Sequence, residues 1–233
     1  NTMQKSPLAP ACFPKLPIVD GVTFATIAAG VRYSGRTDVM LAKLITGTSI
    51  AGVFTKSTTR AAPVLDCQAK LGGDSTTPAA ILVNSGNANA FTGKNGQTSV
   101  TAICDAVADA CDVPVNRVFT SSTGVIGEPL AHDRIIENLE TLNNTQSVDD
   151  VEAAANAIMT TDTYAKGSAK NVQIAGQSVQ IVGIAKGSGM IAPDMATMLV
   201  YIFTDAVFEQ TALQQLVSDT SDRTFNCITV DSD

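Results

Sequence analysis

The sequence predicts a single α/β domain in which mixed sheets pack against helical layers. The first observation is that turn-forming residues recur about every ten residues along the chain, which gives many short elements. The second is that the segments between these turns switch between the period of strands and the period of helices. The third is a hydrophobic content of 45% over 233 residues, enough for a sizeable core. Layers of helices against sheets are the simplest arrangement for such a chain.

The first third of the chain is rich in strand-forming residues. Residues 22–33, 39–45 and 50–55 are bounded by Gly, Asp and Thr, and they favour strands paired in a meander or in hairpins. Residues 60–71 favour a short helix that ends at Gly72. Residues 79–86, "AAILVNSG", are an apolar run closed by turn residues, which is typical of a buried strand.

Helices and strands alternate through the rest of the chain. Apolar residues at helical spacing predict an amphipathic helix over residues 96–111. Residues 117–127, "RVFTSSTGVIG", predict a strand that enters a glycine turn, and residues 172–187 predict a hairpin that turns at Gly176 and Gln177. Further helices are expected over residues 133–142, 148–159 and 209–218, and further strands over residues 197–204 and 225–230.

Charge and hydropathy exclude two classes of protein. The chain has 22 acidic residues against 15 Lys and Arg, a net charge of −7, and its cations are scattered along the sequence, so we expect no basic face of the kind that nucleic-acid binding needs. Its longest apolar stretch, residues 198–204, is too short to cross a bilayer. The N-terminal residues lack the continuous apolar run of a secretory signal, and we expect a cytoplasmic protein.

Cysteine and histidine usage predicts neither a metal centre nor a histidine-based catalytic site. The five cysteines are widely spaced, with no pair at the spacing of a zinc site, and we expect buried free thiols. His132 is the only histidine, and "LAHDRIIENLE" predicts that it lies in the first turn of a helix with Asp133 at the positive end. A serine or cysteine nucleophile with His132 as its base stays open, but we expect the base of an enzyme to lie elsewhere.

Two polar loops follow apolar strands. Residues 84–93, "NSGNANAFTG", could bring backbone N–H groups together around an anion, or they could form a turn whose Asn side chains bond to their own backbone. Residues 120–127 offer the Thr123 hydroxyl and the Gly124 N–H directly after a strand. That pair suits an oxyanion hole, because donors on a rigid edge can hold a developing negative charge. The alternative is a plain turn.

The stretch "GSGMIAPDMATML", residues 187–199, leads through glycines and a proline into an apolar strand. If the backbone is strained there, the Thr197 hydroxyl can attack the carbonyl of Ala196 and release Thr197 as a new N-terminus. The resulting α-amine, with an ordinary pKa of about 8, can act as the base for its own hydroxyl. The alternative is that an Ala-Thr step at the start of a strand is only structural.

Four motifs resemble those of the ornithine acetyltransferase family, also called glutamate N-acetyltransferases. In chain order they are "NSGNANAFTG", "SSTGVIG", "AIMTTDT" and "KGSGMIAPDMATML", and the resemblance extends from about residue 21 to residue 233. It implies a self-cleaving precursor and a fold of stacked αββα-type layers with mixed sheets, as in DmpA and the ornithine acetyltransferases. It also implies transfer of an acetyl group from N2-acetyl-L-ornithine to L-glutamate in arginine biosynthesis.

The resemblance assigns catalytic roles to individual residues. Thr197 matches the nucleophile, which also contacts substrate, and the bond between Ala196 and Thr197 matches the cleavage site. Thr123 and Gly124 match the pair that stabilises the oxyanion.

Two further positions match residues that bind substrate, Thr160 in "AIMTTDT" and Lys186 eleven residues before the nucleophile. Both substrates carry an α-carboxylate, so a cation near the pocket would offset the negative field of the protein. Without the resemblance, Lys186 is interpreted as a solvated residue at a strand end.

The resemblance also divides the chain into two segments. Residues 1–196 would be the α-chain segment of the catalytic domain, and residues 197–233 the start of a β-chain segment that is truncated, because family members continue further. The missing part would carry a glutamate and C-terminal polar groups that bind substrate. Cys227 and Ser232 stand where the family has Arg and Gly, positions without a catalytic role.

The resemblance implies that the α and β chains stay together as an α2β2 heterotetramer. It implies no metal and no cofactor, although some members accept acetyl-CoA as the acetyl donor. Two alternatives remain. One is a self-processing aminopeptidase of the DmpA type, although its members use serine, and the other is a non-catalytic module whose Gly-Asn loops bind an anion.

Overall fold

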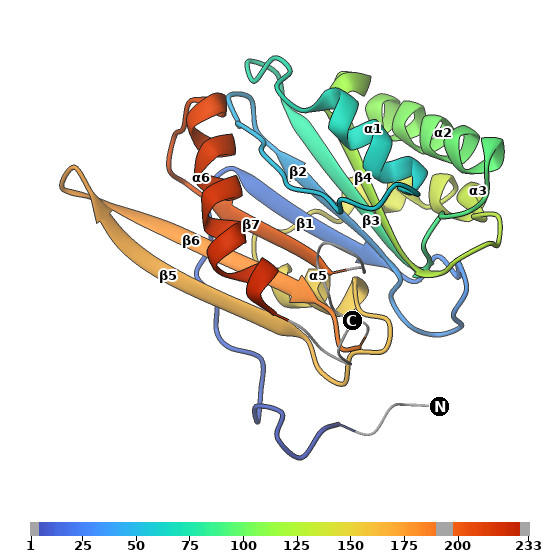
Figure 1. Ribbon diagram of the computed structural model, residues 1–233, viewed down its shortest axis with the longest axis horizontal. Helices are drawn as coiled ribbons and strands as arrows, with labels where there is room; N and C mark the ends of the chain where they lie inside the picture. The colour runs from blue at the N-terminus through green and yellow to red at the C-terminus, as the bar shows by residue number, and fades with distance from the viewer. Residues whose placement is uncertain (1–4, 190–197, 229–233) are drawn as a thin grey trace.

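The computed structural model describes residues 5–189 and 198–228, which fold into two β-sheets and several helices (Figure 1). The first sheet has the strand order β1-β2-β3-β4 and the second has the order β5-β6-β7. The strands are β1 (Val22–Ile27), β2 (Val39–Leu44), β3 (Ala79–Asn87), β4 (Val118–Val125), β5 (Lys166–Ile174), β6 (Gln177–Lys186) and β7 (Leu199–Thr204).

The first sheet is buried on both faces, which explains its apolar sequence. Strands β1, β2 and β3 are antiparallel neighbours. Strand β4 pairs with β3 in parallel and is the last strand of this sheet within the described residues. Met40 and Leu41 are adjacent on β2 and both 0% exposed, because successive side chains of a strand point to opposite faces. The strands predicted from residues 22, 39, 79 and 117 onward are confirmed, with the first ending at Ile27.

Helices cover one face of the first sheet. These helices are α1 (Ala62–Lys70), α2 (Lys94–Cys111), α3 (His132–Ile136) and α4 (Leu139–Asn144). Figure 1 shows α1, α2 and α3 together on the side away from β5 and β6. The apolar stripe of α2 explains this position, because Val100, Ile103 and Val107 share one helix face and are buried against the sheet. The single helix predicted over residues 133–142 is instead the two short helices α3 and α4.

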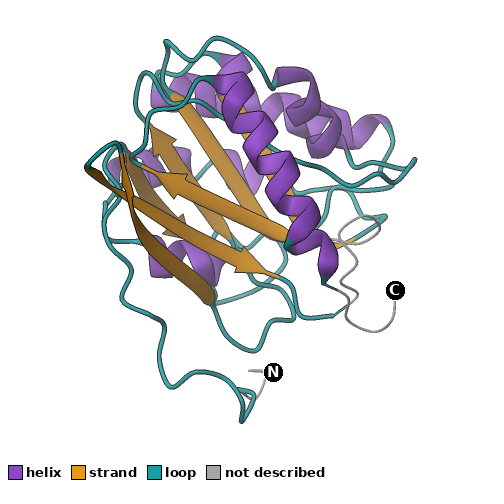
Figure 2. Ribbon diagram, turned by 60° about the vertical axis from the view of Figure 1, so that its left-hand side comes forward, coloured by secondary structure: helices purple, strands orange, loops and turns teal. Residues whose placement is uncertain are grey.

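The second sheet packs on the other face of the first. Side chains of β1, β2 and β3 meet Val182, Ile184 and Phe203 in one buried core, which α5 (Val151–Ala157) also joins. The rings of Phe24 and Phe203 lie 5.1 Å apart in an edge-to-face pair between the two sheets. Figure 2 shows the strands at the centre of the molecule with helices around them. The predicted layered α/β fold with mixed sheets is confirmed.

Two predicted strands are wrong in the described residues. Residues 50–55 form no strand, because the Gln214 side chain of α6 (Gln210–Arg223) bonds the N–H and C=O of Gly52, at 3.1 and 2.9 Å. The helix predicted to end at residue 218 continues to Arg223, and Phe225–Cys227 then form a 3₁₀ turn in place of a strand. The intrinsic strand preference of this segment is therefore overridden by its context.

The five cysteines are free thiols, as predicted. Cys67, Cys104 and Cys111 are buried, but Cys12 and Cys227 are exposed, so the prediction of burial is wrong for these two. Both lie outside the sheets, one before β1 and the other in the turn after α6. Among the helices of residues 5–189 and 198–228, none has the length and apolar character needed to cross a membrane.

Candidate active site

Three of the predicted site residues meet between the two sheets. Thr123 lies on β4, Thr160 follows α5, and Lys186 is the last residue of β6. The Lys186 Nζ donates hydrogen bonds to Thr123 Oγ1 at 3.1 Å and to Thr160 Oγ1 at 2.8 Å. Residues that are 26 and 63 positions apart from the lysine in sequence thus share one cluster. We call Thr123, Thr160 and Lys186 the lysine-threonine cluster.

Lys186 is buried at 5% exposure, so its interpretation as a solvated strand-end residue is wrong. It is the C-terminal residue of β6, and the sheet directs its side chain inward toward β4. Burial, helped by the positive charge of Lys166, lowers the pKa of the Lys186 ammonium, and Asp162 opposes part of this shift. A cation with little access to water interacts strongly with any negative charge placed next to it.

The hydrogen bonds from Lys186 also orient the two threonine hydroxyls. An ammonium group can only donate, so the Oγ1 atoms of Thr123 and Thr160 act as acceptors toward it. Each hydroxyl proton is then left to donate elsewhere. The cluster can therefore present a buried O–H donor at Thr123, which is only 2% exposed.

Gly124 lies next to Thr123 within β4, rather than in a turn after the strand as predicted. Its φ is +134°, and it is paired with Gly86 of β3. A Cβ atom at position 124 would lie 2.3 Å from the carbonyl carbon of Gly86. The position therefore requires glycine, which allows the two strands to approach closely at this point.

Sequence reasoning missed Asp162, although the quoted motif "AIMTTDT" contains it. The Asp162 Oδ1 atom accepts hydrogen bonds from Lys166 Nζ at 2.6 Å and from the Gly187 N–H at 2.8 Å. Burial acts to raise the pKa of Asp162, but these hydrogen bonds and the charges of Lys166 and Lys186 hold it below its ordinary value. The signal in the sequence was an acid two residues after Thr160 in a motif otherwise read for its threonines.

Arg36 was also missed, and no local pattern could have identified it. It comes from the loop between β1 and β2, where it donates to the carbonyls of Met159 and Thr160 and lies 4.4 Å over the Tyr33 ring. Buried Asp38 holds the same loop, because its carboxylate accepts from the backbone N–H groups of residues 29 and 31, each at 2.7 Å. The loop between β1 and β2 thus fixes the backbone carbonyl of Thr160, whereas Lys186 bonds its hydroxyl.

The predicted nucleophile and cleavage bond, Thr197 and Ala196, lie outside the described residues. The chain is described again from Met198, and β7 begins at Leu199. Leu199 is directly paired with Lys186 in the antiparallel register of β6 and β7. The chain that follows the predicted cleavage site therefore enters the second sheet beside the lysine-threonine cluster.

The asparagines of residues 84–93 bind the protein's own backbone. Asn84 Nδ2 donates to the Asn87 carbonyl at 2.9 Å, and Asn89 Nδ2 donates to the Gly96 carbonyl at 3.0 Å. Asn87 Nδ2 donates to the carbonyls of residues 128 and 129. The side-chain amides are thus used to shape the turn, which favours the turn interpretation over an anion cradle.

His132 begins α3, as predicted. Its Nδ1 lies 2.9 Å from Ser99 Oγ of α2, but Ser99 is buried at 3% exposure among the helices. The pair of His132 and Ser99 is not part of the lysine-threonine cluster.

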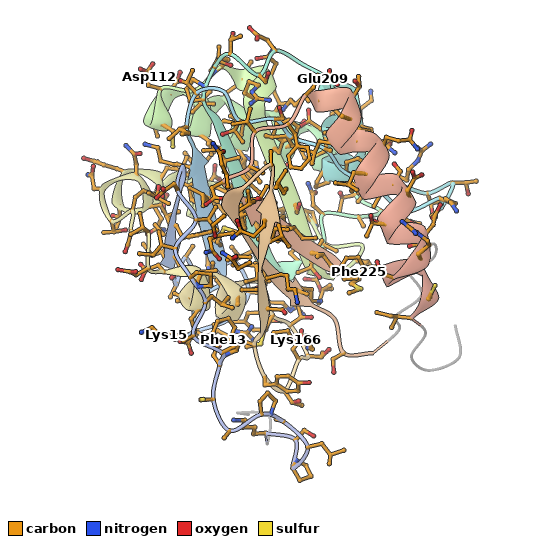
Figure 3. The ribbon with its side chains drawn as sticks, turned by 90° about the vertical axis from the view of Figure 1, so that its left-hand side faces the viewer. Phe13, Lys15, Asp112, Lys166, Glu209 and Phe225 are labelled. Atoms are coloured by element: carbon orange, nitrogen blue, oxygen red, sulfur yellow. The ribbon has the colours of Figure 1, made fainter. Side chains whose placement is uncertain are left out.

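An acidic surface hollow lies elsewhere on the molecule and is lined by Asp105, Asp109 and Asp112. Figure 3 shows Asp112 at the end of the molecule opposite Lys166 and Phe13. This hollow is not part of the lysine-threonine cluster either.

The two facing sheets, with a buried lysine and two threonine hydroxyls between them, define a layered α/β protein with a polar internal site. The chain belongs to the ArgJ family, whose sequence model matches residues 23–233. It is 70% identical to the arginine biosynthesis bifunctional protein ArgJ of Ruegeria pomeroyi over 228 residues, which are 98% of this chain and 56% of that protein. The chain thus spans about half the length of the curated relatives it matches.

Two crystal structures have a similar fold. The arginine biosynthesis bifunctional protein of Bacillus halodurans superposes with a TM-score of 0.70 at 33% identity, covering 78% of this chain and 92% of that one. The ornithine acetyltransferase of Mycobacterium tuberculosis, solved in complex with ornithine, gives a TM-score of 0.65 at 32% identity and covers 78% and 94%. These similarities agree with the family resemblance found in the sequence motifs.

Proposed function

We propose that the protein transfers an acetyl group from N2-acetyl-L-ornithine to L-glutamate, as a step of arginine biosynthesis. Membership of the ArgJ family and the likeness to an ornithine acetyltransferase solved with ornithine support this proposal. The observation that carries it is the lysine-threonine cluster, in which Lys186 joins Thr123 and Thr160. Motif matches alone would not require residues so far apart in the sequence to meet.

The reaction would begin with self-cleavage between Ala196 and Thr197, which frees the α-amine of Thr197. Chain lengths support this step. About four-fifths of this chain is enough to cover over nine-tenths of each solved chain. By contrast, 98% of this chain covers only 56% of the Ruegeria protein. The solved chains are thus roughly half as long as that protein, as expected when such proteins are cut into two.

Acetyl transfer would then follow in two halves. The Thr197 Oγ attacks the acetyl carbonyl of acetylornithine while its own α-amine takes the hydroxyl proton and passes it to the departing ornithine nitrogen. Glutamate next enters, and its amine attacks the acetyl-threonine ester, which returns the hydroxyl to Thr197. In both halves the oxyanion would accept hydrogen bonds from the Thr123 hydroxyl and the Gly124 N–H, each donor contributing about 2.7–4 kcal/mol.

Lys186 would serve both the substrates and the oxyanion. Its ammonium has three N–H donors, and within the described residues two of them are used on Thr123 and Thr160. The third is available for a substrate carboxylate. By accepting from Lys186, the Thr123 oxygen also becomes a more polarised donor toward the oxyanion.

The wider setting follows the family. We infer a cytoplasmic enzyme whose α and β chains form an α2β2 heterotetramer, and which needs no metal or cofactor. Acetyl-CoA is a second possible acetyl donor. Residues 197–233 would begin the β chain and residues 1–196 would be the α chain.

The test is to incubate the full-length protein with acetylornithine labelled in the acetyl group. We expect a mass increase of one acetyl group on the chain that begins at Thr197, and loss of this label to N-acetylglutamate when glutamate is added. A DmpA-type aminopeptidase would instead release free amino acids or acetate without glutamate. A binding module would stay one uncut chain with no adduct, and either result would refute the proposal.

The Lys186→Met variant is expected to lower kcat for acetyl transfer about 100- to 1000-fold, because both threonine hydroxyls lose the donor that orients them. Methionine preserves the volume of the buried side chain. Lys170→Met is the matched control, because Lys170 is an exposed lysine on the neighbouring strand β5. Steady-state kinetics should show normal turnover for the control. Equal turnover in the two variants would rule out the role given to Lys186.

A further inference from the structure

The Asp162 carboxylate joins three separate segments of the chain. Its Oδ1 accepts from Lys166 Nζ at the start of β5 and from the Gly187 N–H just after β6. Its Oδ2 accepts from the Thr160 N–H at 3.3 Å, within the loop between α5 and β5. The side chain itself is 0% exposed. A buried carboxylate is stable only when its oxygens are used in this way, so these bonds hold the three segments together.

Two of these segments carry members of the lysine-threonine cluster. Gly187 follows Lys186 directly, and its φ of +150° is a conformation that glycine adopts readily. The bond from the Gly187 N–H to Asp162 fixes the backbone at the exit of β6. The bond from the Thr160 N–H fixes the backbone of the second threonine. The Asp162 carboxylate thus bonds the backbone next to Lys186 and the backbone of Thr160.

The charged side chains around Lys186 have opposite effects on its protonation. Asp162 faces it from the loop after α5 and favours the ammonium form, whereas Lys166 faces it from β5 and disfavours that form. Arg36, from the loop between β1 and β2, binds the carbonyl of Thr160 on the same loop. The charged form of Lys186 has three N–H donors, so it can donate to both threonines and keep one donor for a substrate carboxylate, whereas the neutral amine has only two donors.

We propose that Asp162 is a positioning residue, which fastens the end of β6 to the loop after α5 and so holds the Lys186 ammonium against Thr123 and Thr160. The proposal deepens the proposed function and rests on it for its kinetic consequence. The claim that Asp162 holds the Lys186 ammonium in place does not depend on the reaction, and its effect on the titration of Lys186 can be measured without turnover.

The experiment compares Asp162→Asn with Asp205→Asn in the full-length protein. Asp205 is a matched control, because its carboxylate also accepts from a backbone N–H of β6, that of Gln180 at 2.9 Å, but at the far end of the strand. The first readout is the titration of the Lys186 side chain, followed by the 13Cε resonance of labelled lysine and assigned with Lys186→Met. The second is kcat for acetyl transfer as a function of pH.

In Asp162→Asn we expect Lys186 to lose its proton at lower pH than in the wild type, because the anion that favours the ammonium form is gone. The high-pH limb of kcat should move to lower pH with it, and kcat at its optimum should fall about 10- to 100-fold as the cluster loosens. Asp205→Asn should leave the Lys186 titration and the pH profile unchanged. A merely structural role for Asp162 would change stability but leave kcat of the folded variant at its optimum close to that of the wild type.

A folded Asp162→Asn protein with the wild-type Lys186 titration would overturn the proposal. If that variant does not fold, Asp162→Glu decides, because it keeps the negative charge but moves the carboxylate relative to the Thr160 and Gly187 N–H groups, so kcat should fall while the protein keeps an acid beside Lys186. A wild-type kcat in Asp162→Glu would then refute the proposal. Absence of acetyl transfer in the wild type would refute the proposed function alone, since the titration needs no activity.

Discussion

The Gly124→Ala variant is expected to lose about 4 kcal/mol or more of its free energy of unfolding, together with all measurable acetyl transfer. The added Cβ would lie 2.3 Å from the Gly86 carbonyl carbon and 2.6 Å from both the Gly86 oxygen and the Asn87 nitrogen. These are backbone atoms of the paired strand, so no side chain can turn aside to make room. Strands β3 and β4 would have to separate next to Thr123, which β4 carries into the site.

Gly127→Ala separates this clash from the cost of an unusual backbone angle. Gly127 has a φ of +79°, but nothing lies within 4 Å of the position that its Cβ would occupy. Alanine there should cost only the left-handed conformation, about 1–2 kcal/mol. Denaturant unfolding measures both variants on the same scale. Similar losses in the two would mean that the close approach of β3 and β4 has no special importance.

The rate of acetyl transfer is a second measurement on the Gly124→Ala variant. If the Gly124 N–H and the Thr123 hydroxyl hold the oxyanion, a shift of β4 by even a fraction of an ångström displaces both donors together. Transfer should then fail at temperatures where the variant is still folded. Normal transfer by folded Gly124→Ala protein would show that the oxyanion is stabilised elsewhere.

The elements that the sequence predicted well are those whose burial pattern is local. The stripe of α2 and the apolar runs of β2 and β3 are visible within one segment, because each element is buried by its own repeat. Residues 50–55 have an equally good strand pattern but form none, since Gln214, some 160 residues later, bonds the backbone of Gly52. A contact at that separation leaves no mark in the local pattern.

The residues of the candidate site likewise fall into those that a local motif identified and those that it did not. The motifs identified Thr123, Thr160 and Lys186, and the structure brings them together. Asp162 and Arg36 were missed, because their importance lies in what they bond to rather than in their neighbours along the chain. Thr160 itself has its hydroxyl bonded by Lys186, its N–H by Asp162 and its carbonyl by Arg36. Two distant segments and an acid two residues further along the same loop thus fix Thr160, and none of these bonds is visible in the motif itself.

The Thr197→Ala variant is expected to remain one intact polypeptide and to show no detectable acetyl transfer. Alanine has no hydroxyl to attack the carbonyl of Ala196, so the chain cannot cleave itself by the proposed route. Without cleavage there is no free α-amine, and without the hydroxyl there is nothing to carry the acetyl group. Intact mass of the full-length wild type and variant shows the first effect, and the labelled-acetyl assay shows the second.

Thr197→Ser is the matched control, because it keeps the hydroxyl and removes only the methyl group that narrows the choice of χ1. It should still yield two chains and an acetylated N-terminal residue, but more slowly. The pair of variants separates two ideas that a single knockout would confuse. Cleavage of Thr197→Ala at the same bond would mean that another group attacks the Ala196 carbonyl. Transfer by an uncut Thr197→Ala chain would mean that the terminal amine is not the base, and the assignment of both roles to one residue would have to be abandoned.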